Sequence, residues 1–122
     1  MKKTLHALVA LTAVTLFVTV ARAQEVYTPG DGVSLPTVVK QAKVEYTQEA
    51  LDAHIEGIVG LETVVLSDGK VGDVKVVRSL DPTYGLDQQA VKSMKLWEFK
   101  PGRKDGKPVA VRVNVNINFT LK

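Results

Sequence analysis

Apolar and polar residues alternate strictly from Val109 to Leu121, and this is the clearest pattern in the sequence. A period of two places successive side chains on opposite faces of a strand. The pattern therefore predicts one long strand with a buried apolar face and a wet face that carries Asn114, Asn116 and Asn118. The apolar positions are Val109, Val111, Val113, Val115, Ile117, Phe119 and Leu121.

Two earlier strands are predicted at residues 58–66 and 71–78, which are both rich in β-branched side chains. The turn Ser67-Asp68-Gly69-Lys70 between them favours a hairpin, because Gly tolerates the positive φ that a tight turn requires. The first of these strands is apolar on both faces, which is typical of a strand in the interior of a sheet.

Two helices are predicted from apolar residues that recur every three or four positions. The first spans residues 47–54, with Thr47 as its N-cap and Gly57 placed to end it. The second spans residues 86–97, and one stripe along it carries Leu86, Ala90, Met94 and Trp97. Large aromatic side chains dominate small cores, so Trp97 and Phe99 are expected to fill the core where this helix meets the sheet.

The order of elements is helix, strand, strand, helix, strand. It predicts an α+β fold in which two helices pack on one face of a three-stranded antiparallel sheet. If the first strand is central, it pairs antiparallel with both others, and the long C-terminal strand lies at an edge. Residues 101–108, which contain two Pro and two Gly, are predicted to form an exposed loop.

The first 23 residues have the three parts of a secretory signal peptide. Lys2 and Lys3 precede an uncharged stretch at residues 5–20, and Ala21-Arg22-Ala23 supplies the small residues of a cleavage site. We expect cleavage after Ala23 and a periplasmic location. The alternative is an uncleaved inner-membrane anchor with the domain on the periplasmic side, although a spanning helix usually needs about 20 apolar residues.

Cleavage leaves an extended linker at residues 24–36 and one folded domain at residues 37–122. The whole chain has 16 Lys and Arg against 13 Asp and Glu, but Lys2, Lys3 and Arg22 belong to the signal. The exported part is then balanced in charge, so its net charge gives no reason to expect nucleic-acid binding. The chain has no Cys, so no disulfide supports the domain.

The residue types that carry chemistry in enzymes do not form a recognisable set. His54 is the one His beyond the signal and is expected on a helix face, and without Cys it cannot build a typical metal site. No Ser has a convincing base partner. Arg103, Lys104 and Lys107 are interrupted by Asp105 and are better explained as a solvated loop than as a phosphate site. We therefore expect no enzyme activity, metal, cofactor or small-molecule substrate.

Six short motifs are spread along residues 35–122. They are Gly57-x-Val59-x-Leu61, Asp68-Gly69-x-Val71, Leu86-Asp87-x-x-Ala90-Val91, Trp97-x-Phe99-x-Pro101, Gly106-Lys107-Pro108-Val109 and Asn116-Ile117-Asn118-Phe119. In order and spacing this set resembles the C-terminal domain of the TonB family, although no single motif is specific.

The resemblance implies a protein-binding module. In TonB proteins the C-terminal domain pairs with a short peptide of an outer-membrane transporter, the TonB box, which adds as a strand beside the last strand of the sheet. Backbone hydrogen bonds supply most of the affinity in this mode of binding. The expected partner is a TonB box-like peptide of an outer-membrane transporter or of another envelope protein. The residues expected to bind it are Val111, Arg112, Val113, Asn114, Val115, Asn116, Ile117 and Asn118.

Three departures from the family limit what the resemblance implies. The transmembrane helix that couples TonB to its proton-driven motor has no convincing counterpart. The long Pro-rich spacer is missing, since residues 24–36 reach at most about 45 Å when extended. Many relatives have Tyr-Pro where this chain has Tyr46-Thr47. The sequence therefore favours peptide binding without force transmission, and the alternatives are a homodimer formed through the same edge or a short anchored energy transducer.

Overall fold

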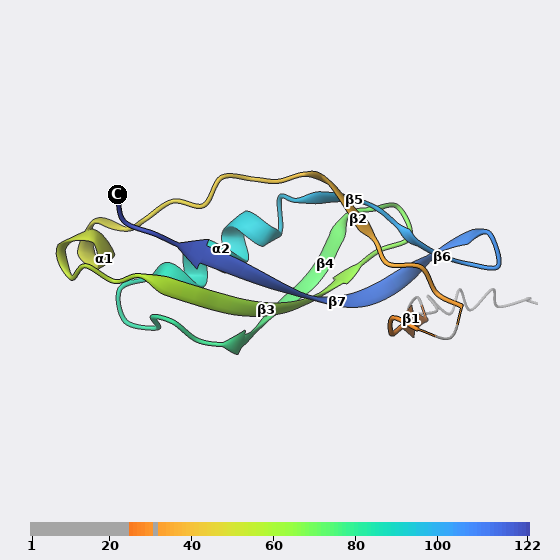
Figure 1. Ribbon diagram of the computed structural model, residues 1–122, viewed down its shortest axis with the longest axis horizontal. Coiled ribbons are helices and arrows are strands. Elements are labelled where there is room, and N and C mark those ends of the chain that lie inside the picture. The colour runs from red at the N-terminus through yellow and green to blue at the C-terminus, as the bar shows by residue number, and fades with distance from the viewer. Residues whose placement is uncertain (1–24, 31) are drawn as a thin grey trace, which may run out of the picture.

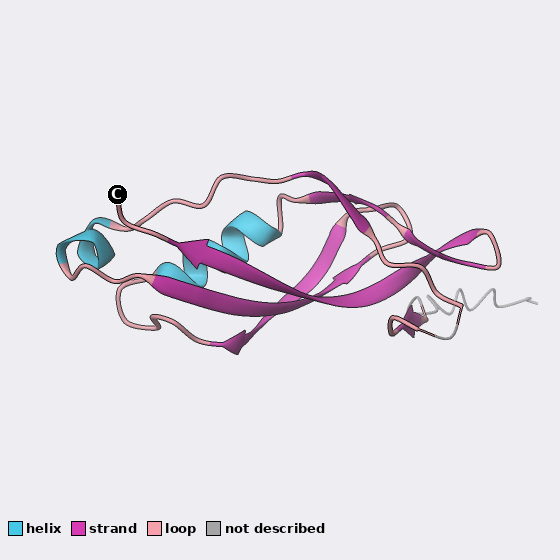
Figure 2. Cartoon of the chain, viewed as in Figure 1, coloured by secondary structure: helices cyan, strands magenta, loops and turns pink. Residues whose placement is uncertain are grey.

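The computed structural model describes residues 25–30 and 32–122, so the predicted signal sequence lies outside the described residues. The described chain has the predicted α+β fold, with the predicted elements in order and four short additional strands (Figure 1, Figure 2). The elements are β1 (Val26–Tyr27), β2 (Thr37–Lys40), α1 (Gln48–Asp52), β3 (Gly57–Val65), β4 (Val71–Arg78), α2 (Leu86–Met94), β5 (Glu98–Lys100), β6 (Gly102–Lys104) and β7 (Lys107–Phe119).

The antiparallel strands β3, β4 and β7 form the centre of the sheet. β3 lies between the other two, as its apolar residues on both faces predict. β3 and β7 pair in one unshifted register, from Gly57 opposite Phe119 to Val65 opposite Val111. The register between β3 and β4, in contrast, shifts twice. The predicted arrangement of these three strands is therefore confirmed.

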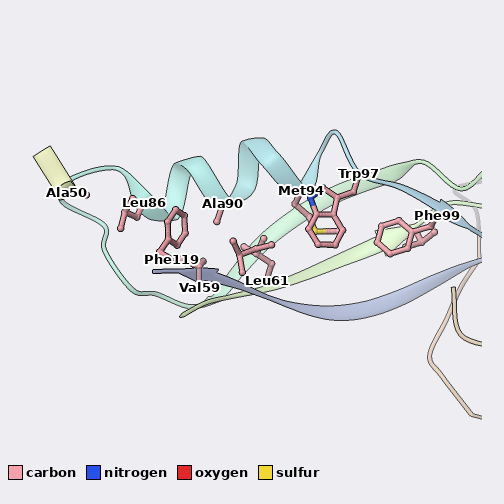
Figure 3. Packing of buried hydrophobic residues seen from close by; sticks show 11 residues of the cluster. Ala50, Val59, Leu61, Leu86, Ala90, Met94, Trp97, Phe99 and Phe119 are labelled. Atoms are coloured by element: carbon pink, nitrogen blue, oxygen red, sulfur yellow. The ribbon is translucent and has the colours of Figure 1, made fainter. Parts of the chain in front are cut away.

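The hydrophobic core lies between α2 and the inner face of the sheet. α2 crosses this face, whereas α1 lies at one end of the sheet (Figure 1). Trp97 and Phe99 stack with their ring centroids 6.1 Å apart and are 8% and 7% exposed, which confirms their predicted place in the core (Figure 3). The buried apolar residues of this core are Ala50, Val59, Leu61, Val65, Leu86, Ala90, Met94, Trp97, Phe99, Ile117 and Phe119.

The first helix starts where predicted and ends earlier. Thr47 is its N-cap, and Thr47 Oγ1 accepts a hydrogen bond from the Ala50 N–H at 3.1 Å. α1 nevertheless ends at Asp52, because His54 adopts a left-handed φ of 55° that no helix can continue. His54 is therefore not on a helix face, and Gly57 begins β3 instead of ending the helix.

The second helix also starts where predicted and ends earlier, at Met94. Its end tightens, because the Trp97 N–H donates to the carbonyl of Met94, three residues back. Gly85 occupies the N-cap position and has no side chain to cap the helix. Asp81 takes over this role, since the Leu86 N–H donates to Asp81 Oδ2 at 3.2 Å.

The prediction of an exposed loop at residues 101–108 is wrong. β6 and the start of β7 form a second hairpin, in which Lys104 pairs with Lys107. The two turn residues, Asp105 and Gly106, have φ of 52° and 76°, and a two-residue type I′ turn requires such a positive pair. Asp-Gly also occupies the turn of the first hairpin. Here Pro101 and Pro108 flank the turn segment, and because Pro is unfavourable within strands, the sequence pattern favours a loop.

The described part of the predicted linker packs against the domain. β1 pairs with β7. Further along, the Ser34 N–H donates to the Arg103 carbonyl and the Arg103 N–H donates to Ser34 Oγ, each at 2.9 Å. β2 then pairs with β5 in a separate two-stranded sheet. The linker is therefore held at two places, by β1 and by Ser34, and β2 follows directly after it.

Candidate functional site

β7 carries all eight predicted binding residues and has three strand partners. β3 pairs with its C-terminal part, β6 with its N-terminal part, and β1 pairs in parallel with the junction between them. Val111 is opposite both Val65 of β3 and Tyr27 of β1, so β1 and β3 lie on opposite edges of β7. In the part of the chain that the structure describes, no strand pairs with the β1 side of β7 beyond Val111. The predicted edge is therefore open from Arg112 onward, whereas Val111 is already paired.

The even-numbered residues of β7 direct their N–H groups to this open edge. Leu66 directly follows β3, and its N–H donates to the Lys70 carbonyl at 2.8 Å on the side of β4. Because N–H directions alternate along a strand, the even-numbered residues of β3 also direct their N–H groups to β4. The odd-numbered residues of β3 then face β7, and the unshifted register places them opposite odd-numbered residues, such as Leu61 opposite Val115. The residues with outward N–H groups are consequently Arg112, Asn114, Asn116 and Asn118.

Side chains along the open edge divide into a wet and an apolar set. The four residues with outward N–H groups also have exposed side chains. On the apolar face Val111 and Ile117 are buried, whereas Val113 and Val115 between them are only half-buried. The apolar face of β7 is therefore least covered midway along the open edge.

The chain between β1 and α1, residues 28–30 and 32–47, forms a wall beside the open edge (Figure 1). Two hollows of about 320 and 360 Å³ lie between this wall and β7. One is lined by Pro29, Leu35, Pro36, Val38 and Phe99 together with Arg112, Val113, Asn114 and Val115. The other is lined by Gln41, Ala42, Lys43, Val44 and Trp97 together with Asn116, Ile117 and Asn118. A segment docked on the edge would therefore lie between β7 and the wall.

Ser93 of α2 holds this wall in place. The Ser93 hydroxyl donates to the carbonyl of Ala42 at 3.0 Å and accepts a hydrogen bond from Trp97 Nε1 at 3.3 Å. The sequence predicts Ser93 only as a helix residue. Its partner Ala42 is 51 residues away, and no local pattern could reveal the contact.

Two buried carboxylates organise the loop between β4 and α2. Asp81 and Asp87 are only 3% and 7% exposed. Asp87 accepts hydrogen bonds from the Ser79 hydroxyl and from the N–H groups of Leu80 and Asp81, the latter two at 2.9 Å. Asp81 accepts from the N–H groups of Thr83, Tyr84 and Leu86. Both carboxylates are thus occupied in shaping the loop.

Hydrogen bonding decides the ionisation of Asp87. Burial acts to raise the pKa of its carboxyl, but the hydrogen bonds from Asp81, Ser79 and Leu80 outweigh this and lower the pKa below its usual value. The carboxylate is therefore charged and stabilised at neutral pH. This arrangement suits a structural anchor, because a general acid or base needs a pKa close to the working pH.

The other charged residues do not assemble a chemical site. Arg103 Nη1 donates to the Gly106 carbonyl at 3.0 Å, and Lys104 Nζ lies 4.8 Å from the centroid of the Tyr27 ring, so both bind within their own surroundings. His54 is exposed. Among residues 25–30 and 32–122, no group of three or more His, Asp or Glu could hold a metal ion. None of the helices described is long and apolar enough to cross a membrane.

Comparison with known proteins extends over most of the chain. The family model of the Gram-negative bacterial TonB protein C-terminal matches residues 42–121. Protein TonB of Vibrio cholerae serotype O1 is 34% identical over 91 residues, which are 74% of this chain and 37% of that protein. Protein tonB2 of Pseudomonas aeruginosa is 36% identical over 77 residues, 63% of this chain and 28% of that protein. The match thus spans little more than a third of the first relative and little more than a quarter of the second.

The fold also agrees with a solved structure. The solution NMR structure of the Pseudomonas aeruginosa TonB CTD has a TM-score of 0.58 to this chain, at 23% sequence identity. The superposition covers 81% of this chain and 95% of that one. At this level of identity the likeness concerns the fold.

Proposed function

Because this chain belongs to the family of Gram-negative bacterial TonB C-terminal domains, we propose that it is a periplasmic module that binds a protein segment during TonB-dependent transport across the outer membrane. The family consists of protein-interaction modules and not of enzymes. The partner is an extended, TonB box-like peptide of an outer-membrane transporter or of another envelope protein. It adds as a strand to β7 at residues 112–118, with Val111 at the boundary.

The observation that carries this proposal is the open edge of β7. Seven consecutive residues, 112–118, pair with β3 on one edge, and in the described chain no strand residue is paired with them on the other. An unpaired row of N–H and C=O groups is a template for a further strand. β1 supports this reading, since an extended segment of the chain already pairs with the same edge at Ala110 and Val111.

The location follows from the predicted export signal at residues 1–23. Cleavage after Ala23 would release a periplasmic module that binds without transmitting force. Mass spectrometry of the exported protein tests this step, with Gln24 as the expected first residue. A product that keeps residues 1–23 and fractionates with the inner membrane would instead support a short anchored energy transducer.

A proline at an outward N–H tests the docking edge. The probe is a synthetic peptide that carries the TonB box of an outer-membrane transporter, titrated into the domain by calorimetry. Asn116→Pro removes the outward N–H and should weaken binding by at least about tenfold, while the thermal melt stays cooperative. Asn116→Ala is the matched control, since it changes the same side chain and keeps the N–H. Equal affinity of Asn116→Pro and the wild type would refute docking on this edge.

A homodimer through the same edge would give a different result. Sedimentation would then show a concentration-dependent dimer that Asn116→Pro converts to a monomer. The TonB box peptide would neither bind nor compete with the dimer. In that case the edge of β7 pairs with a second copy of the chain, and the transporter-binding proposal fails.

A further inference from the structure

β1 pairs with β7 from outside the residues that the family model matches. The family match begins at residue 42, whereas β1 is Val26–Tyr27. β1 lies beside Ala110 and Val111, directly before the open edge begins at Arg112. The first positions of the outer edge of β7 are thus occupied by a segment that lies before the residues matched by the family model.

The direction of the N–H groups shows how β1 is bound. Ala110 is even-numbered, so its N–H and C=O point to the outer edge like those of Arg112. In a parallel ladder a residue of this kind bonds to the two residues that flank its partner. Its partner is Val26, so this geometry directs the Tyr27 N–H to the Ala110 carbonyl and the Ala110 N–H to the Glu25 carbonyl. Tyr27 pairs with Val111, so the same geometry directs the Arg112 N–H to the Tyr27 carbonyl, and the free row of backbone groups begins at the Arg112 carbonyl.

The attachment of β1 is small. It consists of two paired residues, and parallel pairs are slightly less stable than antiparallel ones. The Tyr27 side chain adds the contact with Lys104, whereas its exposed hydrogen bond to Glu25 at 3.2 Å stays within the same segment. Ser34 anchors the chain to β6 independently of β1. β1 can therefore leave the edge while the wall stays in place, and segments with so few contacts open at low free energy.

We propose that β1 is an exchangeable strand that sets the length of the docking edge, an inference that rests on the proposed function. A partner strand that begins at the Arg112 carbonyl and extends to Asn118 binds beside β1. A longer partner strand that reaches Ala110 displaces β1 and binds only the fraction of molecules in which β1 has left. β1 thus favours short partner segments over long ones.

Hydrogen exchange in the absence of any peptide tests whether β1 holds the edge. The Ala110 and Arg112 amides should exchange at least about tenfold more slowly than those of Asn114, Asn116 and Asn118. Tyr27→Pro removes the donor to Ala110 and should abolish this protection. Tyr27→Ala keeps the N–H of residue 27 and should retain a large part of the protection from exchange. Equal exchange at Ala110 in the wild type and in Tyr27→Pro would overturn the inference.

Peptide binding tests the length rule. The probes are two synthetic TonB box peptides, one of seven residues and one lengthened by three residues at each end. Tyr27→Pro should raise the affinity for the longer peptide by about fivefold and leave that for the shorter peptide unchanged, because only the longer one competes with β1. If Tyr27→Pro raised the affinity equally for both peptides, or did not raise it for the longer one, the result would contradict the rule. Binding of neither peptide would refute the proposed function, while the exchange result would still decide the place of β1.

Discussion

β7 and β4 flank the central strand β3, and the edges that they turn away from β3 are built differently. β7 pairs with β3 over nine consecutive residue pairs without a shift in register. β4 pairs with the same strand β3, but its register shifts twice within eight residues. The exposed positions along β4 include the charged residues Asp73, Lys75 and Arg78. One strand therefore offers a regular edge and the other an interrupted, charged one.

This difference indicates which edge can accept a partner. Bulges twist a strand and disturb the spacing of its hydrogen-bonding groups, and charges at an edge discourage pairing with another chain. β4 has both features. β7 has neither midway along its open edge, where Asn114 and Asn116 replace charges. The same sheet thus protects one edge and leaves the other available, so the use of an edge depends on its own residues and not on the fold class.

The largest effect is expected from a proline on the inner ladder of β7. Val115→Pro removes an N–H that faces β3 and leaves the opposing carbonyl of Leu61 without its donor. The free energy of unfolding should fall by about 3 kcal/mol. Asn116→Pro, one residue further, should lower it by less than about 1 kcal/mol, because its N–H faces the open edge. Urea denaturation of the two variants measures the contrast. Similar losses in both would show that the N–H directions are assigned wrongly.

A smaller loss is expected at the loop that follows β4. Asp87→Asn replaces a buried carboxylate that accepts three hydrogen bonds and should lower the free energy of unfolding by about 2 kcal/mol at pH 7. Asp73→Asn is the control, since Asp73 is exposed on β4. It should have little effect. A cost at Asp87 no larger than at Asp73 would contradict the anchoring role.

The same loop predicts a dependence on pH. The folded state lowers the pKa of Asp87, so its contribution to stability is fully present above the unfolded pKa of about 3.9 and is lost as pH falls through the folded value. The difference between the wild type and Asp87→Asn should therefore shrink below about pH 4. Urea denaturation at a series of pH values measures it. A difference that grows with acidity would have the wrong sign.

The irregular pairing of β4 can be probed at Gly60. A Cβ at this position would lie 2.8 Å from Arg78 Cβ, across a register shift between β3 and β4. Gly60→Ala should cost about 1 kcal/mol, since overpacking exceeds the entropy gained by removing a Gly. Gly72→Ala is the matched control on β4, because its nearest neighbour is the flexible end of Leu66 at 3.3 Å. A melting temperature that does not fall in Gly60→Ala would mean that the two strands have room to separate there.

The sequence predicts the elements with strong local patterns. The alternation of β7 and the Asp-Gly turn after β3 each depend on neighbouring residues, and both are confirmed. The open edge also follows from the order of the strands. The place where the open edge begins does not follow from the sequence, because it is set by β1, which is only two residues long and has no pattern of its own.

Contacts between distant residues are also beyond the reach of sequence patterns. The Ser93 contact with Ala42 joins α2 to the wall, and nothing near either residue indicates it. Asp87 fits the charge preference of a first helical turn, but its burial and its three donors depend on how the preceding loop folds back. The direction of the outward N–H groups depends on the hydrogen bonds across the first hairpin, which no sequence pattern reveals.

The smallest effect is expected at Arg112, the one charged residue among residues 111–118. Arg112 Nε lies 3.5 Å from Glu62 Oε1 of β3, and both side chains are well exposed. The charge is thus directed toward the neighbouring strand and does not guard the open edge. Exposed ion pairs contribute little, so Arg112→Ala should change the free energy of unfolding by less than about 0.5 kcal/mol.

Arg112→Ala should also leave the affinity for a TonB box peptide within about twofold of the wild type, because the backbone N–H of Arg112 remains and backbone bonds supply most of the affinity. Calorimetric titration measures this, and Glu62→Ala serves as the control that removes the other half of the ion pair. If Arg112→Ala weakens binding strongly while Glu62→Ala does not, the Arg112 side chain reaches the partner directly. The open edge of β7 would then recognise charge as well as backbone, and its contrast with β4 would depend on regular pairing alone.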